Sequence, residues 1–430
     1  MRESWALRIA SYAAVVGGLA VPAAALNITL DYAHDTFFST NPTAKAAIEA
    51  AAADLNAAIT TTLAPITTDL FTGQGYATGG RNTTATFDAA FYYTNPTTGA
   101  QVEVAQPTLA SDEFRVYVGG RNLTSSSLGV GGPGGVGLSL NVVGYPESLN
   151  AAVSQAASAA DAALTRGNVG PTIGMLSGSI SLSPTTAVYS LDFGSTLGNF
   201  WIDLDTNNNG IQDSSAQLAN YWHFDHTTPV AIGKNDLYSV ALHELIHTLG
   251  IGSSSTWNSL VAGTTWLGAE AIAENGTGAN LIALDGDHIA PSLLSTRISD
   301  GAPQETVMDP TITVGSRKTL TMLDLAFLRD LGWETIDPIV PAGPADFNAN
   351  GAVDGADLAI WTGAYGYTAS GDANSDGKTA GDDYIMWQTA YGTTTAKAAG
   401  GVVPEPATGA LAALVLLGLR LISRKRATAL

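Results

Sequence analysis

The sequence of 430 residues contains no cysteine, so it can form neither disulfide bonds nor thiolate metal sites. Any zinc must therefore be held by histidine and carboxylate side chains. Only six histidines are present, which leaves few combinations for such a site. Bound calcium is one substitute for the missing cross-links.

Basic residues are also scarce, with 18 Lys and Arg against 38 Asp and Glu and a formal net charge of −20. This excess repels nucleic acid, which we exclude as a partner. Many of the carboxylates lie in short Asp/Asn/Gly runs that are suited to binding cations. The length and the 45% apolar composition indicate a large core and two or three structural units.

The beginning of the chain has the pattern of an export signal. Arg2 and Arg8 precede an apolar run from Ile9 to Val21, and small residues follow at Ala23–Ala25. This arrangement predicts a signal peptide over residues 1–25 and export of the protein. A buried or membrane-spanning N-terminal helix is the alternative.

The end of the chain has a second targeting pattern. Val403-Pro404-Glu405-Pro406 precedes an apolar stretch over residues 407–419 and the basic residues Arg420, Arg424, Lys425 and Arg426. Residues 403–430 resemble a PEP-CTERM sorting tail, which implies an exosortase-type processing enzyme and transient or permanent membrane anchoring at the cell surface. A plain membrane anchor is the alternative, although the apolar part is short for a span of about 20 residues.

Periodicity predicts a mixed domain of strands and helices over residues 26–335. The glycine cluster from Gly129 to Gly137 is expected to interrupt its strands with loops. The fold class that we expect is α+β, a twisted mixed sheet with helices packed on it. The expected strands are 27–35, 83–93, 113–118 and 199–204, and the expected helices are 43–59, 146–164, 238–249 and 319–331, with Asn235 or Asp236 as N-cap of the third.

The strongest chemical pattern is His243-Glu244-Leu-Ile-His247 within the third helix. Helical residues four apart lie on the same face, so the two imidazoles can bind one ion. Glu244 is then placed to accept a proton from water activated by the metal. The apolar neighbours in the motif indicate a buried helix, which argues against a chance match on a surface.

Extended to Gly250, this motif resembles the metzincin clan of zinc peptidases, a likeness that covers residues 231–333. In that clan the third ligand stands three residues after the glycine, but here that position is Ser253. The resemblance to the branch with an insertion makes His288 the expected third ligand. The remaining alternatives are Asp285 or Asp287, Glu270 or Glu274 in a gluzincin-like arrangement, and His223 or His226.

Thr306–Pro310 resembles the Met-turn of the same clan, with Met308 as a hydrophobic floor below the zinc. An ordinary core methionine is the alternative.

Upstream, an Asp/Asn run with Gly210 is either a calcium loop or only a polar loop. The second alternative stays open because no acid stands at the twelfth position of the loop. Its oxygen-bearing residues are Asp203, Asp205, Asn207, Asn209 and Asp213.

A segment with Pro338, Pro341 and Pro344 predicts a stiff linker over residues 336–344. After it, residues 345–392 repeat at a period of 26, with oxygen side chains at calcium-loop positions and glycine at position 6. A spacer over residues 393–402 leads to the sorting tail. The expected calcium ligands are Asp346, Asn348, Asn350, Asp354 and Asp357 in the first loop and Asp372, Asn374, Asp376 and Asp383 in the second.

Each loop leads into one helix and no helix precedes it, so the module resembles a type I dockerin, a small all-α module. The resemblance implies calcium binding and a possible cohesin-like partner. For the whole chain we expect an exported zinc endopeptidase acting on peptide or protein substrates through Glu244. The alternative is a catalytically weak or inactive surface adhesin or matrix scaffold with a calcium-binding module.

Overall fold

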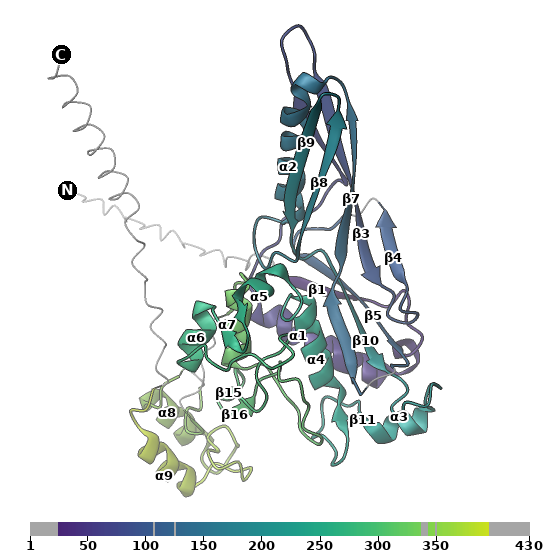
Figure 1. Ribbon diagram of the computed structural model, residues 1–430. Helices are drawn as coiled ribbons and strands as arrows, with labels where there is room; N and C mark the ends of the chain where they lie inside the picture. Colours follow the sequence, from purple (N-terminus) through teal and green to yellow (C-terminus); the bar gives the residue numbers. More distant parts are fainter. Residues whose placement is uncertain (1–24, 106–107, 124–125, 337–342, 349–350, 395–430) are drawn as a thin grey trace, which may run out of the picture. The chain divides into compact units, whose positions relative to one another are not determined.

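The computed structural model describes residues 25–105, 108–123, 126–336, 343–348 and 351–394. The chain forms two units, Met1–Val340 and Pro341–Leu430, and the division lies within the segment predicted as a linker (Figure 1). Most of the predicted signal peptide, most of that linker, most of the spacer and the whole sorting tail lie outside the described residues. Among the described helices, none has the length and apolarity needed to cross a bilayer.

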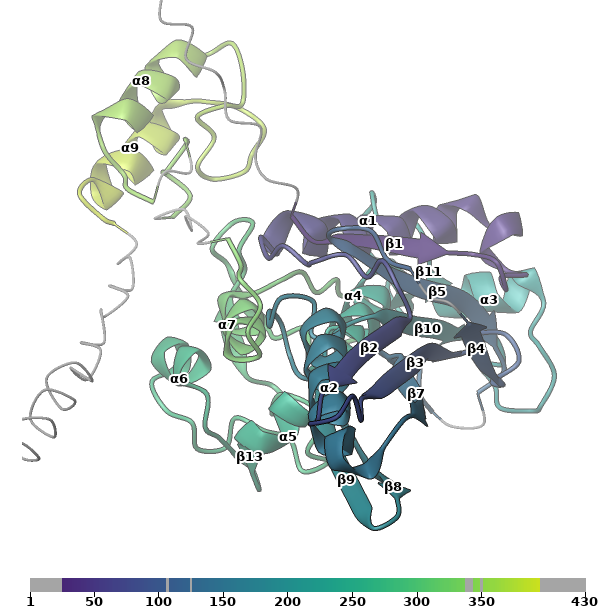
Figure 2. The ribbon, with the colours of Figure 1, turned by 90° about the horizontal axis from the view of Figure 1, so that it is seen from above.

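The first unit is built on a four-stranded sheet in the order β1-β5-β10-β6. Its first three strands are parallel, and the edge strand β6 runs antiparallel to β10. Figure 2 shows α1 running alongside β1. Helix α1 also packs against α4 within the main core, because its alanines allow close approach. The bounds are β1 Asn27–Asp31, β5 Glu113–Arg121, β10 Leu197–Asp203, β6 Gly129–Pro133, α1 Pro42–Ala58 and α4 Leu237–Thr248.

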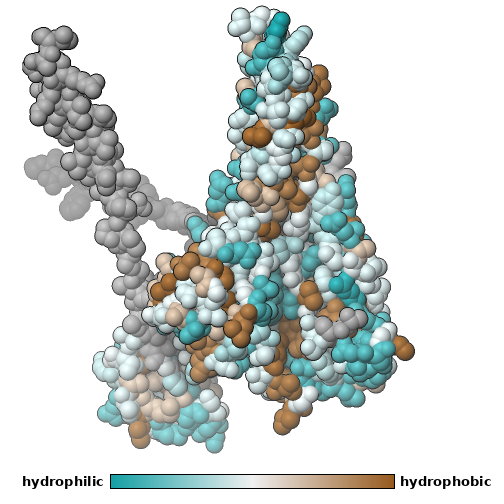
Figure 3. Space-filling model, in the orientation of Figure 1, coloured by the Kyte–Doolittle hydropathy of each residue, from teal (hydrophilic) through white to brown (hydrophobic). Residues whose placement is uncertain are grey.

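A second core lies between α2, a four-stranded antiparallel sheet and the hairpin β8–β9, which project from the main sheet (Figure 1). Gly73 and Gly75 allow α2 to touch β2, since a Cβ at Gly73 would lie 2.2 Å from the Ala152 carbonyl oxygen. Apolar patches mark this projection in Figure 3. Met175 of β8 and Val188 of β9 are exposed. The bounds are α2 Leu149–Leu164, β2 Leu70–Gly75, β3 Thr83–Thr94, β4 Gln101–Ala105, β7 Gly135–Val143, β8 Gly174–Leu182 and β9 Thr185–Phe193.

The expectation that Gly129–Gly137 interrupts the strands was wrong. The segment supplies β6 and the start of β7, with only Gly134 between them. The glycines serve close packing, because a Cβ at Gly131 would lie 2.2 Å from the Glu244 carbonyl oxygen on α4. Glycine here lets a strand lie directly on a helix.

The part after α4 is irregular, and its apolar side chains join the main core. Trp257 of α5, Trp266 and Phe327 of α7 pack together in tilted pairs, with ring centroids 4.7 to 5.7 Å apart. Helix α7 begins at Met322, later than expected, because the Thr321 side chain caps it. The other elements here are short: α3 Ser215–Tyr221, β11 Trp222–His223, β12 Asn235–Asp236, α5 Ser255–Leu260, β13 Val261–Ala262, β14 Thr265–Trp266, α6 Ala269–Asn275, β15 Leu294–Thr296, β16 Pro303–Glu305 and α7 Met322–Asp330.

The described part of the second unit contains two helices, α8 Gly355–Ala364 and α9 Gly381–Ala390, each preceded by a loop. Its buried apolar cluster is small and consists of Ala345, Val353, Ala373 and Trp387. A core of this size supplies little hydrophobic stabilisation. The described part of the chain is thus a mixed α/β protein with several sheets, compatible with the expected α+β class, followed by a small helical unit.

Candidate metal centre

Helix α4 carries the first two histidines into the interior. Of the two N-cap residues expected, the structure uses Asp236, whose carboxylate accepts a hydrogen bond from the Ser239 backbone N–H at 3.1 Å. The apolar residues of α4 are buried, as the sequence indicated. His243 and Glu244 are only 8% and 7% exposed.

The chain leaves α4 through two glycines in the left-handed region, Gly250 at φ +107° and Gly252 at φ +74°. A Cβ on Gly252 would lie 2.3 Å from the Asp287 carbonyl oxygen. The downstream loop therefore packs directly on the turn after His247. This contact brings His288 to the two histidines of α4.

The three histidines meet through their Nε2 atoms. The Nε2 of His247 lies 3.2 Å from that of His243 and 3.2 Å from that of His288. Two nitrogens bound to one tetrahedral zinc at about 2.0–2.1 Å lie about 3.3 Å apart. The spacing therefore fits one shared zinc-sized ion. Among the residues that the structure describes, this is the one group of three or more His, Asp or Glu side chains that could hold a metal ion together.

The opposite ring nitrogen of each histidine is already occupied. Carbonyl and carboxylate oxygens only accept hydrogen bonds, so each Nδ1 bonded to one must carry the proton. In neutral imidazoles each Nε2 then carries a lone pair, and these lone pairs face one another without a proton between them. A cation removes this repulsion. The Nδ1 acceptors are the Val307 carbonyl for His243 (2.8 Å), the Ile251 carbonyl for His247 (2.8 Å) and the Asp285 carboxylate for His288 (2.9 Å).

Burial favours the uncharged forms of the groups on α4. It lowers the pKa of His247 to about 4 and that of His243 well below its usual value, and the neighbouring histidines act in the same direction. Burial also raises the pKa of Glu244 to about 8, which the Gly131 N–H partly offsets. Neutral imidazole is the form that binds metals.

Glu244 and the histidines line one cavity of about 620 Å³. Strand β6 forms one wall of this cavity, and the segment from Asp309 to Ile312 forms another. The cavity thus opens between an edge strand and a loop, with the three histidines in its wall. Its remaining lining residues are Ser126, Ser127, Leu128, Val240, Gly252, Ser253 and Asp287.

The segment around Met308 connects the histidines. Besides the Val307 bond to His243, the Met308 carbonyl accepts the N–H of Ile289, the residue after His288, at 3.0 Å. The buried Asp324 carboxylate accepts the Val307 N–H at 3.1 Å, and burial raises the pKa of this carboxyl. Met308 itself is fully buried, as expected of a hydrophobic floor and equally of a core residue.

The structure also places the alternative ligands. Asp285 orients His288 through Nδ1 and is not in the ligand group, and neither is Asp287. Ser253 donates to the His247 carbonyl at 3.1 Å. The four remaining alternatives lie outside the group as well: Glu270 pairs with Arg329, Glu274 lies on α6, His223 contacts the Thr228 carbonyl, and the His226 carbonyl accepts from Arg317.

Several contributors were not identified from the sequence. These are the Val307 and Ile251 carbonyls that accept from the histidines, the orienting role of Asp285, and the buried side chains of Asp324 and Lys318. The Asp-Gly-Asp-His spacing alone could have indicated the Asp285 contact, because an acidic side chain three residues away can reach the ring. The others depend on contacts between distant segments.

The polar loop over residues 203–213 is closed by its own side chains. Asp205 accepts the N–H groups of Asn209 and Gly210 at 3.1 and 2.6 Å, and Asp213 accepts the Thr206 N–H at 2.9 Å. Burial raises the pKa of Asp203. These bonds define a folded loop, with no group of three acids converging among the described residues.

In the second unit, equivalent positions of the two loops form equivalent hydrogen bonds. Asp357 and Asp383 each accept the N–H of the asparagine nine residues earlier at 3.2 Å. Trp361 Nε1 donates to the Ala380 carbonyl at 3.0 Å, and Trp387 Nε1 donates to the Asp354 carbonyl at 2.9 Å. The repeat therefore forms a pair in which each indole is bonded to the other loop.

The expected calcium ligands lie in these loops, except that Asn350 lies outside the described residues. Asp346 and Asp372 each accept the N–H of the glycine at position 6, at 2.8 and 2.7 Å. The side chains of Asn374 and Asp376 instead bond neighbouring backbone and Asp382. The same turn is thus formed in both loops, and Asp354 caps α8.

No protein-family model, no curated protein and no solved structure matched the chain when it was compared with each.

Proposed function

We propose that this chain is an exported zinc-dependent endopeptidase in which His243, His247 and His288 hold the metal and Glu244 is the general base. The observation that carries the proposal is the convergence of three Nε2 atoms, with that of His247 3.2 Å from each of the other two and every Nδ1 used as a donor. Zinc is the favoured ion because the ligands are three neutral imidazoles with tetrahedral spacing.

Zinc, when bound, lowers the pKa of water to about 7 and polarises a carbonyl group. Glu244 lines the same cavity as the ligands and accepts the proton released as water attacks the peptide carbonyl. The protonated carboxyl can then donate that proton to the leaving amine. This sequence of steps requires no covalent acyl-enzyme.

Strand β6 provides a way to hold an extended substrate. Among the described strands it pairs with β10 alone, and Gly129, Val130 and Gly131 also line the cavity. An exposed strand edge binds an extended peptide through main-chain hydrogen bonds. A peptide or unfolded protein segment added along β6 passes the histidine cluster, which supports a protein substrate.

The arrangement of the first unit supports the metzincin-like hypothesis in detail. A twisted sheet with an antiparallel edge strand borders the cavity, α4 carries the two histidines, and the Met308 segment lies next to His243. The departure from the clan pattern at Ser253 is met by His288. The likeness remains a proposal about fold family, as do export and processing of the C-terminal tail.

For the second unit we propose two calcium ions, one in each loop, in a dockerin-like module that a cohesin-like partner could bind. The reciprocal tryptophan bonds and the repeated aspartate contacts support it. Under the alternative hypothesis, the protein is a surface scaffold that uses this module for binding and hydrolyses no peptide bond. Stoichiometric zinc and Glu244-dependent cleavage separate the two hypotheses.

The test compares purified wild type, Glu244→Gln and the control Glu270→Gln for cleavage of an unfolded protein with zinc present. Glu244→Gln keeps the shape and the metal ligands but removes the base, so we expect a loss of about 100-fold or more in rate with unchanged zinc content. Glu270→Gln, in an exposed pair with Arg329, should keep full activity. Equal cleavage by wild type and Glu244→Gln, or no cleavage by any of them, would refute the enzyme.

A further inference from the structure

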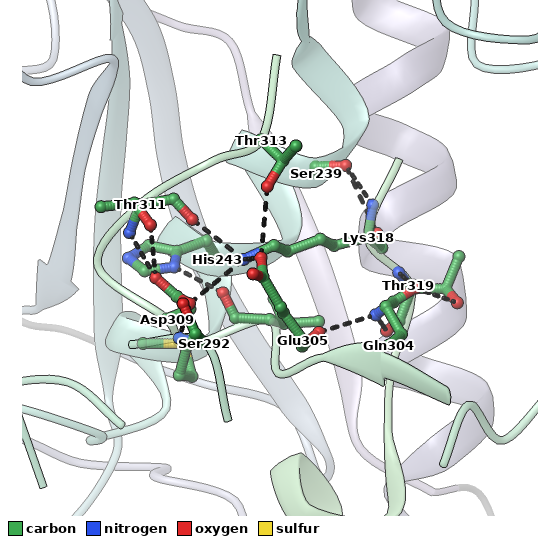
Figure 4. A network of polar contacts seen from close by, with 12 residues as sticks. Ser239, His243, Ser292, Gln304, Glu305, Asp309, Thr311, Thr313, Lys318 and Thr319 are labelled. Atoms are coloured by element: carbon green, nitrogen blue, oxygen red, sulfur yellow. Dashed lines mark hydrogen bonds and ion pairs between the residues drawn. The ribbon is translucent and has the colours of Figure 1, made fainter. Parts of the chain in front are cut away.

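Lys318 is a buried cation beside the metal centre, and nothing in the proposed chemistry uses it. Its side chain is 4% exposed, and Figure 4 shows its amine among Glu305, Asp309 and Thr311, close to His243. A lysine is rarely buried unless it is paired. Its contacts therefore indicate a specific role.

The amine connects three parts of one loop. Lys318 Nζ donates to the Thr311 carbonyl at 2.9 Å and pairs with Glu305 at 3.2 Å and Asp309 at 3.8 Å. Asp309, fully buried, also accepts the N–H of Ser292 at 2.7 Å and that of Thr311 at 2.7 Å. One positive charge thus holds both ends of the segment 305–311.

The backbone of the same residue is bonded to the zinc helix. The Lys318 N–H donates to Ser239 Oγ at 2.8 Å, and Ser239 Oγ donates to the N-cap Asp236 at 2.7 Å. Arg317, the preceding residue, donates to both carboxylate oxygens of Asp236 at 3.0 and 2.7 Å. Residues 317 and 318 therefore fix the loop relative to α4.

The segment held in this way contains the two carbonyls that orient the ligand loops. The Val307 carbonyl accepts from His243 Nδ1, and the Met308 carbonyl accepts from Ile289. Asp309 to Ile312, just after them, form a wall of the cavity. A shift of this segment would move both a ligand and the substrate wall.

We propose that Lys318 is a positioning residue of the metal centre, which holds segment 305–311 so that His243 presents Nε2 to the metal. The inference rests on the proposed zinc site. Without the amine, the buried Asp309 carboxylate and Glu305 repel each other, and the Val307 carbonyl loses its fixed position. Loss of an orienting partner typically weakens metal binding by about 10- to 100-fold.

The experiment compares wild type with Lys318→Met, which keeps the length of the side chain, and with Lys45→Met, a surface lysine paired to Glu49 at 3.6 Å. Zinc affinity is measured by competition with a chromogenic chelator, and the visible absorption of the cobalt-loaded protein reports ligand geometry. We expect about 10- to 100-fold weaker zinc binding and an altered cobalt spectrum for Lys318→Met only.

Glu305→Gln is the second variant, because Lys318→Met can fail to fold. Glu305 is 28% exposed, so its amide should be tolerated, with a smaller loss of affinity and a smaller spectral change. Zinc affinity and spectra equal to wild type in both variants overturn the role of Lys318 and leave the zinc site standing. A wild-type protein that binds neither zinc nor cobalt overturns the site itself.

Discussion

The two proposed metal sites, one in each unit, are built in opposite ways. In the first unit, three imidazoles converge from segments up to 45 residues apart, on a framework whose main core holds nearly fifty buried side chains. In the second, anionic side chains lie within two short loops around a core of Ala345, Val353, Ala373 and Trp387. One site is positioned by the fold, and the other lies in a unit with little else to hold it together.

This difference assigns different energetic roles to the ions. The large core of the first unit should fold without zinc, which then contributes affinity and chemistry. The second unit has few apolar contacts to offset its chain entropy, so ion binding becomes part of its folding free energy. Removing each metal should therefore produce different losses.

The largest effect is expected from a change of the proposed third zinc ligand. His288→Ala should lower zinc affinity by more than the about 10- to 100-fold expected for an orienting residue, because the site loses a donor. Ser253→Ala, which removes only the hydroxyl that donates to the His247 carbonyl, should keep it. Isothermal titration of zinc into the metal-free proteins measures both, and equal affinities would move the third ligand elsewhere.

Features that depend on local sequence patterns were predicted better than features that depend on contacts between distant segments. The spacing of His243 and His247 depends on one helical turn, and the repeated loops depend on positions within twelve residues, so both were accessible from sequence. His288 required the resemblance, because contacts between distant segments, such as that of Gly252 with Asp287, bring its loop to α4. Val307, Asp324 and Lys318 act through backbone and buried contacts across the fold, which residue types alone do not encode.

The glycine cluster shows why the strands were the weaker prediction. Glycine disfavours strands in isolation, yet β6 needs it at 129 and 131 to lie on α4. The hairpin β8–β9 was missed for a related reason. Its alternating serines and glycines carry little apolar periodicity, while its buried side is formed with α2.

Selective removal of calcium sharpens the comparison from the other side. A calcium-selective chelator should unfold the second unit while leaving the first intact, since only the second has a minimal core. Limited proteolysis should then cut within residues 345–392 and spare the domain around α4. Asp383→Asn should produce the same pattern without chelator, whereas Asp88→Asn, on β3 of the first unit, should not. Resistance of the second unit to both treatments would contradict a calcium-dependent fold.

The last prediction concerns pH and the metal-free first unit. The pKa of Glu244 is about 8 in the folded protein and 4.5 when unperturbed, so between these values the folded state binds more protons. Stability supplied by the protonated carboxyl is therefore complete below pH 4.5 and is lost as pH rises toward 8. Glu244→Gln should not lose stability in this way, because glutamine does not titrate.

Metal-free Glu244→Gln should thus match wild type near pH 4.5 and become progressively more stable than wild type up to pH 8. The difference grows by at most about 1.4 kcal/mol per pH unit, because one group titrates. The histidines are common to both proteins, so their titration cancels. Urea unfolding of the first unit, followed at several pH values, measures the difference, and a difference that stays constant with pH would show that Glu244 is ionised in the folded state.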